Sequence, residues 1–131
     1  GGVEPAEERE ALSAVRRFIE LHGNSRFEPM GDLIHRDGMG TPIDVRIQNR
    51  AGFRRRDDAG GIEYLVLPEV WRGEVCAGMD AVTVAKSLAT RGMIKSGGNG
   101  KLQNFQRVPG FPNPVRCYVV TSGIFGDEAH A

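Results

Sequence analysis

The stretch 68–92 constrains the fold most, because it predicts two helices separated by only two or three residues. Pro68 suits the first position of a helix, where a backbone N–H would have no partner inside the helix. Gly78 can end that helix in a left-handed conformation, and Asp80 can cap the start of the next one. We therefore expect two helices joined by a tight turn, over 68–77 and 80–91.

The second of these helices has two faces of different character. Its expected buried face carries apolar side chains at helical spacing: Ala81, Val82, Ala85, Leu88 and Ala89. Its other face carries Thr83, Lys86, Ser87 and Thr90. Short hydrogen-bonding side chains and a lysine, without a carboxylate, are what a helix in a DNA major groove needs. An ordinary amphipathic helix with a solvated polar face would show the same pattern, so both interpretations stay open.

The segments around the helix pair predict one domain over residues 1–131, since a chain of this length accommodates one hydrophobic core. Helical spacing of apolar residues predicts a first helix, and alternation predicts several strands. The helix is expected over 5–22, and the strands over 45–48, 51–56, 62–67, 101–108 and 115–121. His22 continues the buried face of the first helix and is expected to be partly buried at its end.

The order of these elements predicts an α+β fold, because a strand–loop–strand directly after a helix-turn-helix corresponds to the wing of a winged helix. The fold class is therefore a winged helix-turn-helix with an extra N-terminal helix and β-hairpin. Segment 28–44 is rich in Gly and Pro and has few apolar anchors, so we expect a flexible loop there. His35 and Asp37 lie in that loop without further residues at metal-ligand spacing.

Positive charge is concentrated in the C-terminal two thirds of the chain, although the net charge is zero. Residues 81–126 contain six Lys or Arg and no Asp or Glu. Such segregation indicates a surface that faces a polyanion, unless the cations are scattered around the fold. Arg116, in the last strand, adds to this charge. The candidate DNA-binding residues are Thr83, Lys86, Ser87, Thr90, Arg91, Lys95, Lys101, Arg107, Arg54 and Arg55. Arg54 and Arg55, beside Asp57 and Asp58, could instead belong to a self-compensated turn.

The sequence carries no catalytic signature, so we expect no enzymatic activity, metal or cofactor in this chain. It has no H-E-x-x-H, C-x-x-C or G-x-S-x-G motif. Segment 97–101, GGNGK, resembles a phosphate loop only in part. A P-loop would need Gly in place of Lys95 and a hydroxyl residue in place of Leu102, so a wing turn is the better prediction.

The two cysteines do not form a disulfide framework, and we expect buried, reduced thiols at Cys76 and Cys117. No apolar run is long enough for a transmembrane helix, and the N-terminus does not resemble a signal peptide. We therefore expect a cytoplasmic protein without membrane contact. The chain begins without methionine, so we also expect it to be a C-terminal fragment of a larger protein.

Four segments carry a resemblance to a known family: RRFIELHGNSRF (16–27), NRAGFRRR (49–56), EYLVLPEVWRGEVCAGMD (63–80) and CYVVTSGIF (117–125). They resemble the C-terminal segment of a family that carries only the designation "domain of unknown function". Its members are large proteins of phages, plasmids and integrating elements with an ATPase core upstream. Relatives in mobile cassette chromosomes are taken to be helicases similar to the minichromosome-maintenance type. Segment 28–44 does not match the family pattern.

The resemblance implies a C-terminal winged-helix accessory domain of a mobile-element helicase or replication protein, with ATP chemistry confined to the upstream core. DNA, duplex or forked, and that ATPase core are the expected partners, and a monomer is the expected state of the fragment. One alternative is a docking or regulatory winged helix without DNA affinity. It would expose an apolar patch that includes Phe105, Phe111 or Trp71. An autonomous transcriptional regulator would add a dimerisation helix, and none is expected after residue 125.

Overall fold

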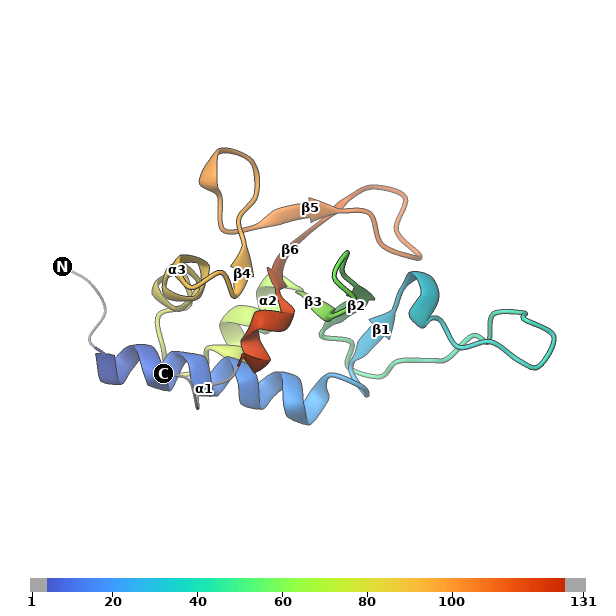
Figure 1. Cartoon of the computed structure of the whole chain (residues 1–131), viewed down its shortest axis with the longest axis horizontal. Coiled ribbons are helices and arrows are strands. Elements are labelled where there is room, and N and C mark those ends of the chain that lie inside the picture. Colours follow the sequence, from blue (N-terminus) through green and yellow to red (C-terminus); the bar gives the residue numbers. More distant parts are fainter. Residues whose placement is uncertain (1–4, 127–131) are drawn as a thin grey trace.

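The computed structural model describes residues 5–126, which form an α+β fold of helices packed against a six-stranded sheet (Figure 1). The helices are α1 (Pro5–His22), α2 (Pro68–Val70), the π-helical turn η2 (Trp71–Val75) and α3 (Ala81–Thr90). The strands are β1 (Phe27–Pro29), β2 (Gly52–Arg56), β3 (Ile62–Val66), β4 (Ile94–Lys95), β5 (Asn104–Gln106) and β6 (Val115–Val120). The described residues also include three 3-10 turns: η1 (Gly31–Leu33), η3 (Gly98–Gly100) and η4 (Ser122–Phe125).

The sheet has the strand order β1-β2-β3-β6-β4, and β5 pairs with β6 off this path. Only β1 and β2 are parallel, and every other pairing is antiparallel. The expected β2–β3 hairpin is confirmed, and Asp57 shapes its turn by accepting hydrogen bonds from the backbone of Ala59 and Gly61. The first residue of β2 must be glycine, because the Cα of Gly52 lies against the backbone of the partner strand β3. A Cβ there would come within 1.7 Å of the Leu65 carbonyl oxygen.

The helices cover one face of the sheet and form the main core with it. In Figure 1, α1 runs beneath α2 and α3, and η4 returns to it. The Arg16 guanidinium donates to the Ile124 carbonyl over 2.7 Å and so ties α1 to η4. The opposite face of the sheet has a smaller core, which contains Phe53, Leu65, Val108, Cys117 and Val119.

Trp71 is the largest fully buried side chain and joins three elements. Its ring stacks on Tyr118 of β6 with centroids 4.7 Å apart, and its indole N–H donates to the Ala81 carbonyl over 3.1 Å. The π-helical turn begins at this residue, because the Cys76 N–H donates to the Trp71 carbonyl. An i to i+5 bond places Cys76 one turn above Trp71, so both side chains enter the core.

Several expectations for the secondary structure are confirmed, and three need correction. The first helix, the β2–β3 hairpin, the second helix of the pair and the strand 115–121 lie where they were predicted, within one residue at each end. The strand predicted over 45–48 is wrong, because that segment has no neighbouring strand and Val45 is exposed. The helix predicted over 68–77 is α-helical only over Pro68–Val70, continues as the π-helical turn Trp71–Val75, and ends there. The strand predicted over 101–108 is much shorter, since β5 covers only Asn104–Gln106.

Segment 28–44 contains more hydrogen-bonded structure than its composition indicates. It includes the end of β1, the turn η1 and a hairpin-like turn closed by the Arg36–Pro42 bridge. Asp37 supports this turn by accepting from the backbone N–H groups of Met39 and Thr41. The chain beyond η1, residues 34–47, extends away from the sheet as an arm, at the right in Figure 1.

Replacing Trp71 by Ala is expected to lower the free energy of unfolding by about 3–5 kcal/mol, because it removes a buried indole and leaves a cavity. Urea denaturation followed by far-UV circular dichroism measures this loss. Val82→Ala serves as the control, since Val82 is half exposed and its truncation should cost less than about 0.5 kcal/mol. Equal midpoints for the two variants would contradict the central role of Trp71.

Candidate functional site

The helix α3 begins as its sequence predicts. Gly78 has a positive φ of 80°, which ends the preceding turn in the left-handed conformation. The Asp80 carboxylate accepts hydrogen bonds of 3.0 Å from the backbone N–H groups of Val82 and Thr83. The bond from Thr83 is the main reason why the pKa of Asp80 is lowered. These contacts fix the position of α3 relative to the turn before it.

The exposed face of α3 differs in two residues from the predicted one. Thr83, Lys86 and Thr90 are exposed as expected. Ser87 is only 8% exposed, so its assignment to the DNA-facing surface is corrected. The helix is rotated so that Val84 enters the core, which turns Ser87 toward α1 and leaves Val82 50% exposed. The outward face is therefore centred on Lys86.

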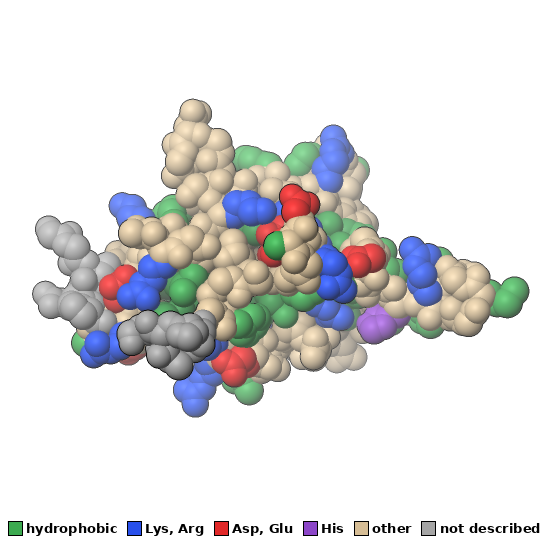
Figure 2. All heavy atoms as spheres, viewed as in Figure 1, with side chains coloured by type: hydrophobic (Ala, Val, Ile, Leu, Met, Phe, Trp, Pro, Cys, Tyr) green, Lys and Arg blue, Asp and Glu red, His purple; other side chains and the backbone are tan. Residues whose placement is uncertain are grey.

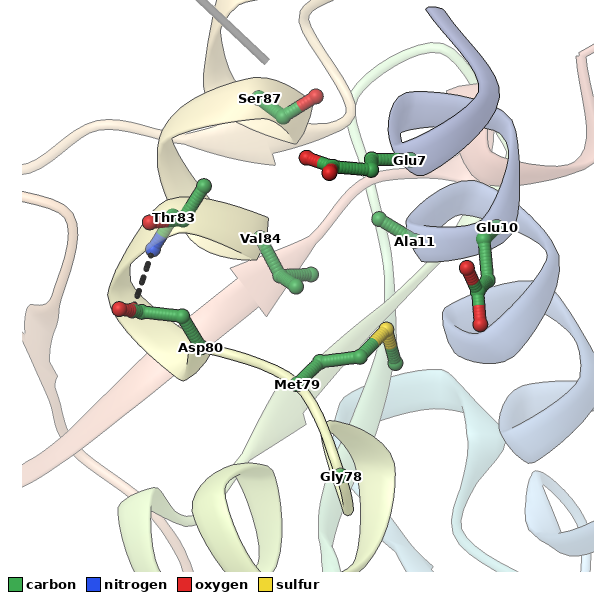
Figure 3. Close-up of a pocket in the computed structure, with 9 residues that line it drawn as sticks. All are labelled: Glu7, Glu10, Ala11, Gly78, Met79, Asp80, Thr83, Val84 and Ser87. Atoms are coloured by element: carbon green, nitrogen blue, oxygen red, sulfur yellow. Dashed lines mark hydrogen bonds between the residues drawn. The ribbon is translucent and has the colours of Figure 1, made fainter. Parts of the chain in front are cut away.

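Ser87 lies at a pocket of about 260 Å³ between α3 and α1, which we call the acidic pocket (Figure 3). Figure 3 shows Glu7 of α1 pointing toward Ser87, with Glu10 further along the same helix. Asp80 adds a third carboxylate to the lining. Carboxylates repel phosphate, so this edge of α3 is unsuited to nucleic acid.

Arg91 crosses between the same two helices. Its Nε donates to Glu8 Oε1 over 2.7 Å, and this hydrogen bond is the main reason why the pKa of Glu8 is lowered. Arg91, one of the candidate DNA-binding residues, is thus held to α1 by an acidic partner. Its contribution to an anion-binding surface is smaller than the sequence predicted.

The other edge of α3 borders a groove of about 690 Å³, which we call the hairpin groove. Val82 lines it from α3, and Tyr118 lines it from β6. The other lining residues come from the segment that leads into β5, from β5 itself and from β6. They are Gly97, Gly98, Asn99, Lys101, Leu102, Gln103, Asn104, Phe105 and Arg116. The lining contains two cations and no carboxylate, so its charge is opposite to that of the acidic pocket.

Four cations of α3 and the β5–β6 region form no salt bridge with an acid among residues 5–126, although Lys86 is near enough to Asp80 to help lower its pKa: Lys86, Lys101, Arg107 and Arg116. Lys86 lies one helical turn after Val82, and all four side chains are exposed. The Arg116 guanidinium lies 5.2 Å from the centroid of the Phe105 ring, directly across the β5–β6 pairing. These cations could neutralise phosphates without first breaking an ion pair.

The remaining candidate DNA-binding residues have partners within the fold. Arg54 donates to the carbonyls of Gly23, Asn24 and Phe27, which closes the chain after α1. Arg55 and Lys95 both pair with the buried carboxylate of Glu63, at 2.6 Å and 3.2 Å. The acid that compensates Arg55 and Lys95 is thus Glu63, directly across the β2–β3 hairpin from Arg55, and not the neighbouring Asp57 or Asp58.

The cations as a whole do not form one continuous patch. Figure 2 shows Lys and Arg side chains spread over the visible face, with Asp and Glu side chains among them. Arg56 pairs with Asp32, and Arg50 pairs with Glu28. The positive charge that is concentrated along the sequence is therefore partly neutralised by ion pairs in the fold, whereas the lining of the hairpin groove contains no Asp or Glu.

Two of the three aromatic residues named for a docking patch are exposed. Phe105 is 64% exposed beside the hairpin groove, and Phe111 is 40% exposed. Trp71 is fully buried, so its place in an exposed patch is corrected. Phe111 packs edge to face on Phe53 and beneath the Arg50 guanidinium, which covers the smaller core. Phe105 has no such covering role, and sequence pattern alone did not distinguish these aromatic residues.

Both thiols are buried and unpaired, as expected. Burial raises the pKa of Cys76 to about 12 and that of Cys117 to about 11. Thiols with such pKa values are protonated at neutral pH and are poor nucleophiles. His22, also expected to be partly buried, packs its ring 4.7 Å from that of Phe18.

Comparison of the chain with models of known protein families and with curated proteins finds no match. Within residues 5–126, no group of three or more His, Cys, Asp or Glu side chains could hold a metal ion. Across the same residues, no helix combines the length and the apolar character required to cross a membrane.

The buried thiols are expected to react with a thiol reagent such as DTNB only when the protein unfolds. Native pKa values of about 12 and 11 leave far less thiolate at pH 8 than the ordinary value in an unfolded chain does. Labelling of the native protein should be at least about 100-fold slower than labelling in guanidinium chloride. Absorbance of the released thiolate measures both rates, and fast reaction of one native thiol would contradict the burial.

Proposed function

We propose that this chain is a winged-helix domain that binds DNA through the outward face of α3 and the β5–β6 hairpin. The observation that carries this proposal is the acid-free groove between those two elements, with the exposed cations Lys101 and Arg116 in its lining. Lys86 on α3 and Arg107 just after β5 are also exposed, and none of the four cations forms a salt bridge with an acid among residues 5–126. The resemblance to helicase-like proteins of mobile elements agrees with it. The domain would then help to place a larger DNA-acting protein on its substrate.

The order and pairing of the elements support the winged-helix assignment. A helix, a strand, two closely connected helices and a strand–loop–strand follow one another as α1, β3, α2 with η2, α3 and the β5–β6 hairpin. In a winged helix the last strand of the wing pairs with the strand before the helix-turn-helix. Here β6 pairs antiparallel with β3 as well as with β4 and β5. The strands β1 and β2 extend this arrangement at the β3 edge.

The side chains on α3 favour contact with phosphates over reading of bases. Lys86 is a point charge that can approach a phosphate. Thr90 donates its hydroxyl to the Lys86 carbonyl, so only its oxygen lone pairs remain for a ligand. The side chain of Thr83, at the border of the acidic pocket, hydrogen-bonds the Asp80 carboxylate and helps to lower the pKa of Asp80. With Ser87 turned inward, few donors are left for base recognition, and we expect weak sequence preference.

Docking on the ATPase core of a parent protein remains the alternative function, and the arm 34–47 favours it. Met39 at its turn is 90% exposed, and Ile43 and Val45 are each nearly half exposed. Figure 2 shows hydrophobic side chains at the free end of this arm. In Figure 1 the arm and α3 lie at opposite ends of the molecule, so the two functions could coexist.

Replacing Lys86 by Ala is expected to weaken binding to a duplex oligonucleotide and to reduce its salt dependence. Loss of one phosphate contact should make the slope of log K against log salt shallower by about one. Fluorescence anisotropy of a labelled 20-base-pair duplex, titrated at several NaCl concentrations, measures both effects.

The matched control is Arg46→Ala, which removes an exposed cation from the arm 34–47. It should leave the duplex affinity and its salt slope unchanged. Absence of duplex binding by the unmodified protein even at low salt would refute the DNA-binding function and leave the docking alternative.

A further inference from the structure

We propose that the hairpin groove binds unpaired DNA and that Phe105 provides the surface on which one of its bases stacks. This inference rests on the DNA-binding function proposed above and specifies the form of DNA that the hairpin side of the molecule takes. The duplex would lie on the outward face of α3. The domain would therefore recognise a junction between single-stranded and double-stranded DNA.

The first observation is the exposure of Phe105. Its side chain is 64% exposed, more than that of Phe111 or Phe125. Phe111 and Phe125 contact other aromatic rings, Phe53 and Tyr64 respectively. Within residues 5–126, the ring partner of Phe105 is the guanidinium of Arg116. Exposing a ring to water costs free energy, so a ligand that covers it would gain affinity.

The second observation is the chemical composition of the groove next to this ring. Lys101 and Arg116 supply two positive charges, and Gln103 and Asn104 supply side-chain amides. Of these amides, Gln103 donates to the Tyr118 hydroxyl and Asn104 donates to the Lys95 carbonyl. The groove therefore combines an exposed aromatic ring with two cations that could contact nucleic-acid phosphates, and its lining has no carboxylate. This is the usual composition of a site that binds single-stranded nucleic acid.

The third observation concerns what duplex DNA could offer to Phe105. Bases inside a duplex are stacked on one another and present their edges to a protein, so their faces are not accessible to a side-chain ring. Unpaired bases expose both faces and stack on aromatic side chains with little regard to sequence. An exposed ring in a cationic groove thus fits a single strand better than a duplex. An acidic polypeptide shares the charge of DNA but lacks the bases.

The test compares four probes by fluorescence anisotropy at constant salt. These are a dT20 strand, an abasic strand of the same length and charge, a 20-base-pair duplex and polyglutamate. The unmodified protein is expected to bind dT20 more tightly than the abasic strand. Phe105→Ala should weaken binding to dT20 by about 5-fold to about 150-fold, the effect of losing one stacked base. It should leave binding to the abasic strand and the duplex unchanged.

Two further variants keep the test specific. Phe105→Trp should restore the binding of dT20, because the indole offers a larger stacking surface. Leu21→Ala truncates a side chain of similar exposure on α1 and should have no effect on any probe. Because Phe105 is exposed, its truncation should leave the thermal midpoint close to that of the unmodified protein, which circular dichroism checks.

The outcomes separate this inference from the proposed function. If the duplex binds but dT20 binds no better than the abasic strand, the stacking inference is overturned while the DNA-binding function stands. If Phe105→Ala weakens polyglutamate binding as much as dT20 binding, the groove is a peptide surface and the inference is also overturned. If no DNA probe binds, the proposed function and this inference fail together.

Discussion

The stacking of Trp71 on Tyr118 is the contact on which the arrangement of α3 and the β5–β6 hairpin depends. The Trp71 indole donates to the Ala81 carbonyl at the start of α3, and the Tyr118 hydroxyl accepts from the side chain of Gln103 just before β5. One buried pair thus sets the positions of both walls of the hairpin groove. Because Trp71 is fully buried and Tyr118 is only 3% exposed where it lines the groove, the two walls are held in place before any ligand arrives. A preformed site avoids the entropic cost of ordering its walls when it binds.

The helix α3 separates two surfaces of opposite charge, and this separation orients a polyanion. On one edge, Glu7 and Glu10 of α1 and Asp80 at the start of α3 line the acidic pocket, and on the other, Lys101 and Arg116 line the hairpin groove. A helix with its side chains is about 10–12 Å wide, whereas electrostatic interactions at physiological ionic strength are screened over about 8 Å. Each edge therefore presents its own field to a ligand. A nucleic-acid backbone that approaches α3 is repelled on the α1 side and drawn toward the hairpin.

Local signals in the sequence predicted most of the secondary structure, and long-range contacts decided the rest. The spacing of apolar residues located α1, and Asp80 and Gly78 located the start of α3, because each depends on a few neighbouring residues. The alternation at 45–48 failed, since a strand also needs a neighbour and the chain supplies none there. The orientation of Ser87 depends on packing against α1, about 80 residues earlier in the chain, which periodicity within α3 does not reveal. Likewise, the partners of Arg54 and Lys95 lie some 30 residues away.

Ion pairing within the fold also limits how strongly the domain can hold DNA by charge alone. Of the cations between residues 81 and 126, Arg91 and Lys95 have acidic partners, which leaves Lys86, Lys101, Arg107 and Arg116. Four phosphate contacts correspond to a salt slope of about −3 to −4, well below that of proteins which capture DNA unaided through six to ten contacts. Such weak binding becomes effective when the domain is tethered to a protein already on DNA, because tethering raises its local concentration. It also lets the domain release and rebind as that protein moves, which suits an accessory module better than an independent regulator.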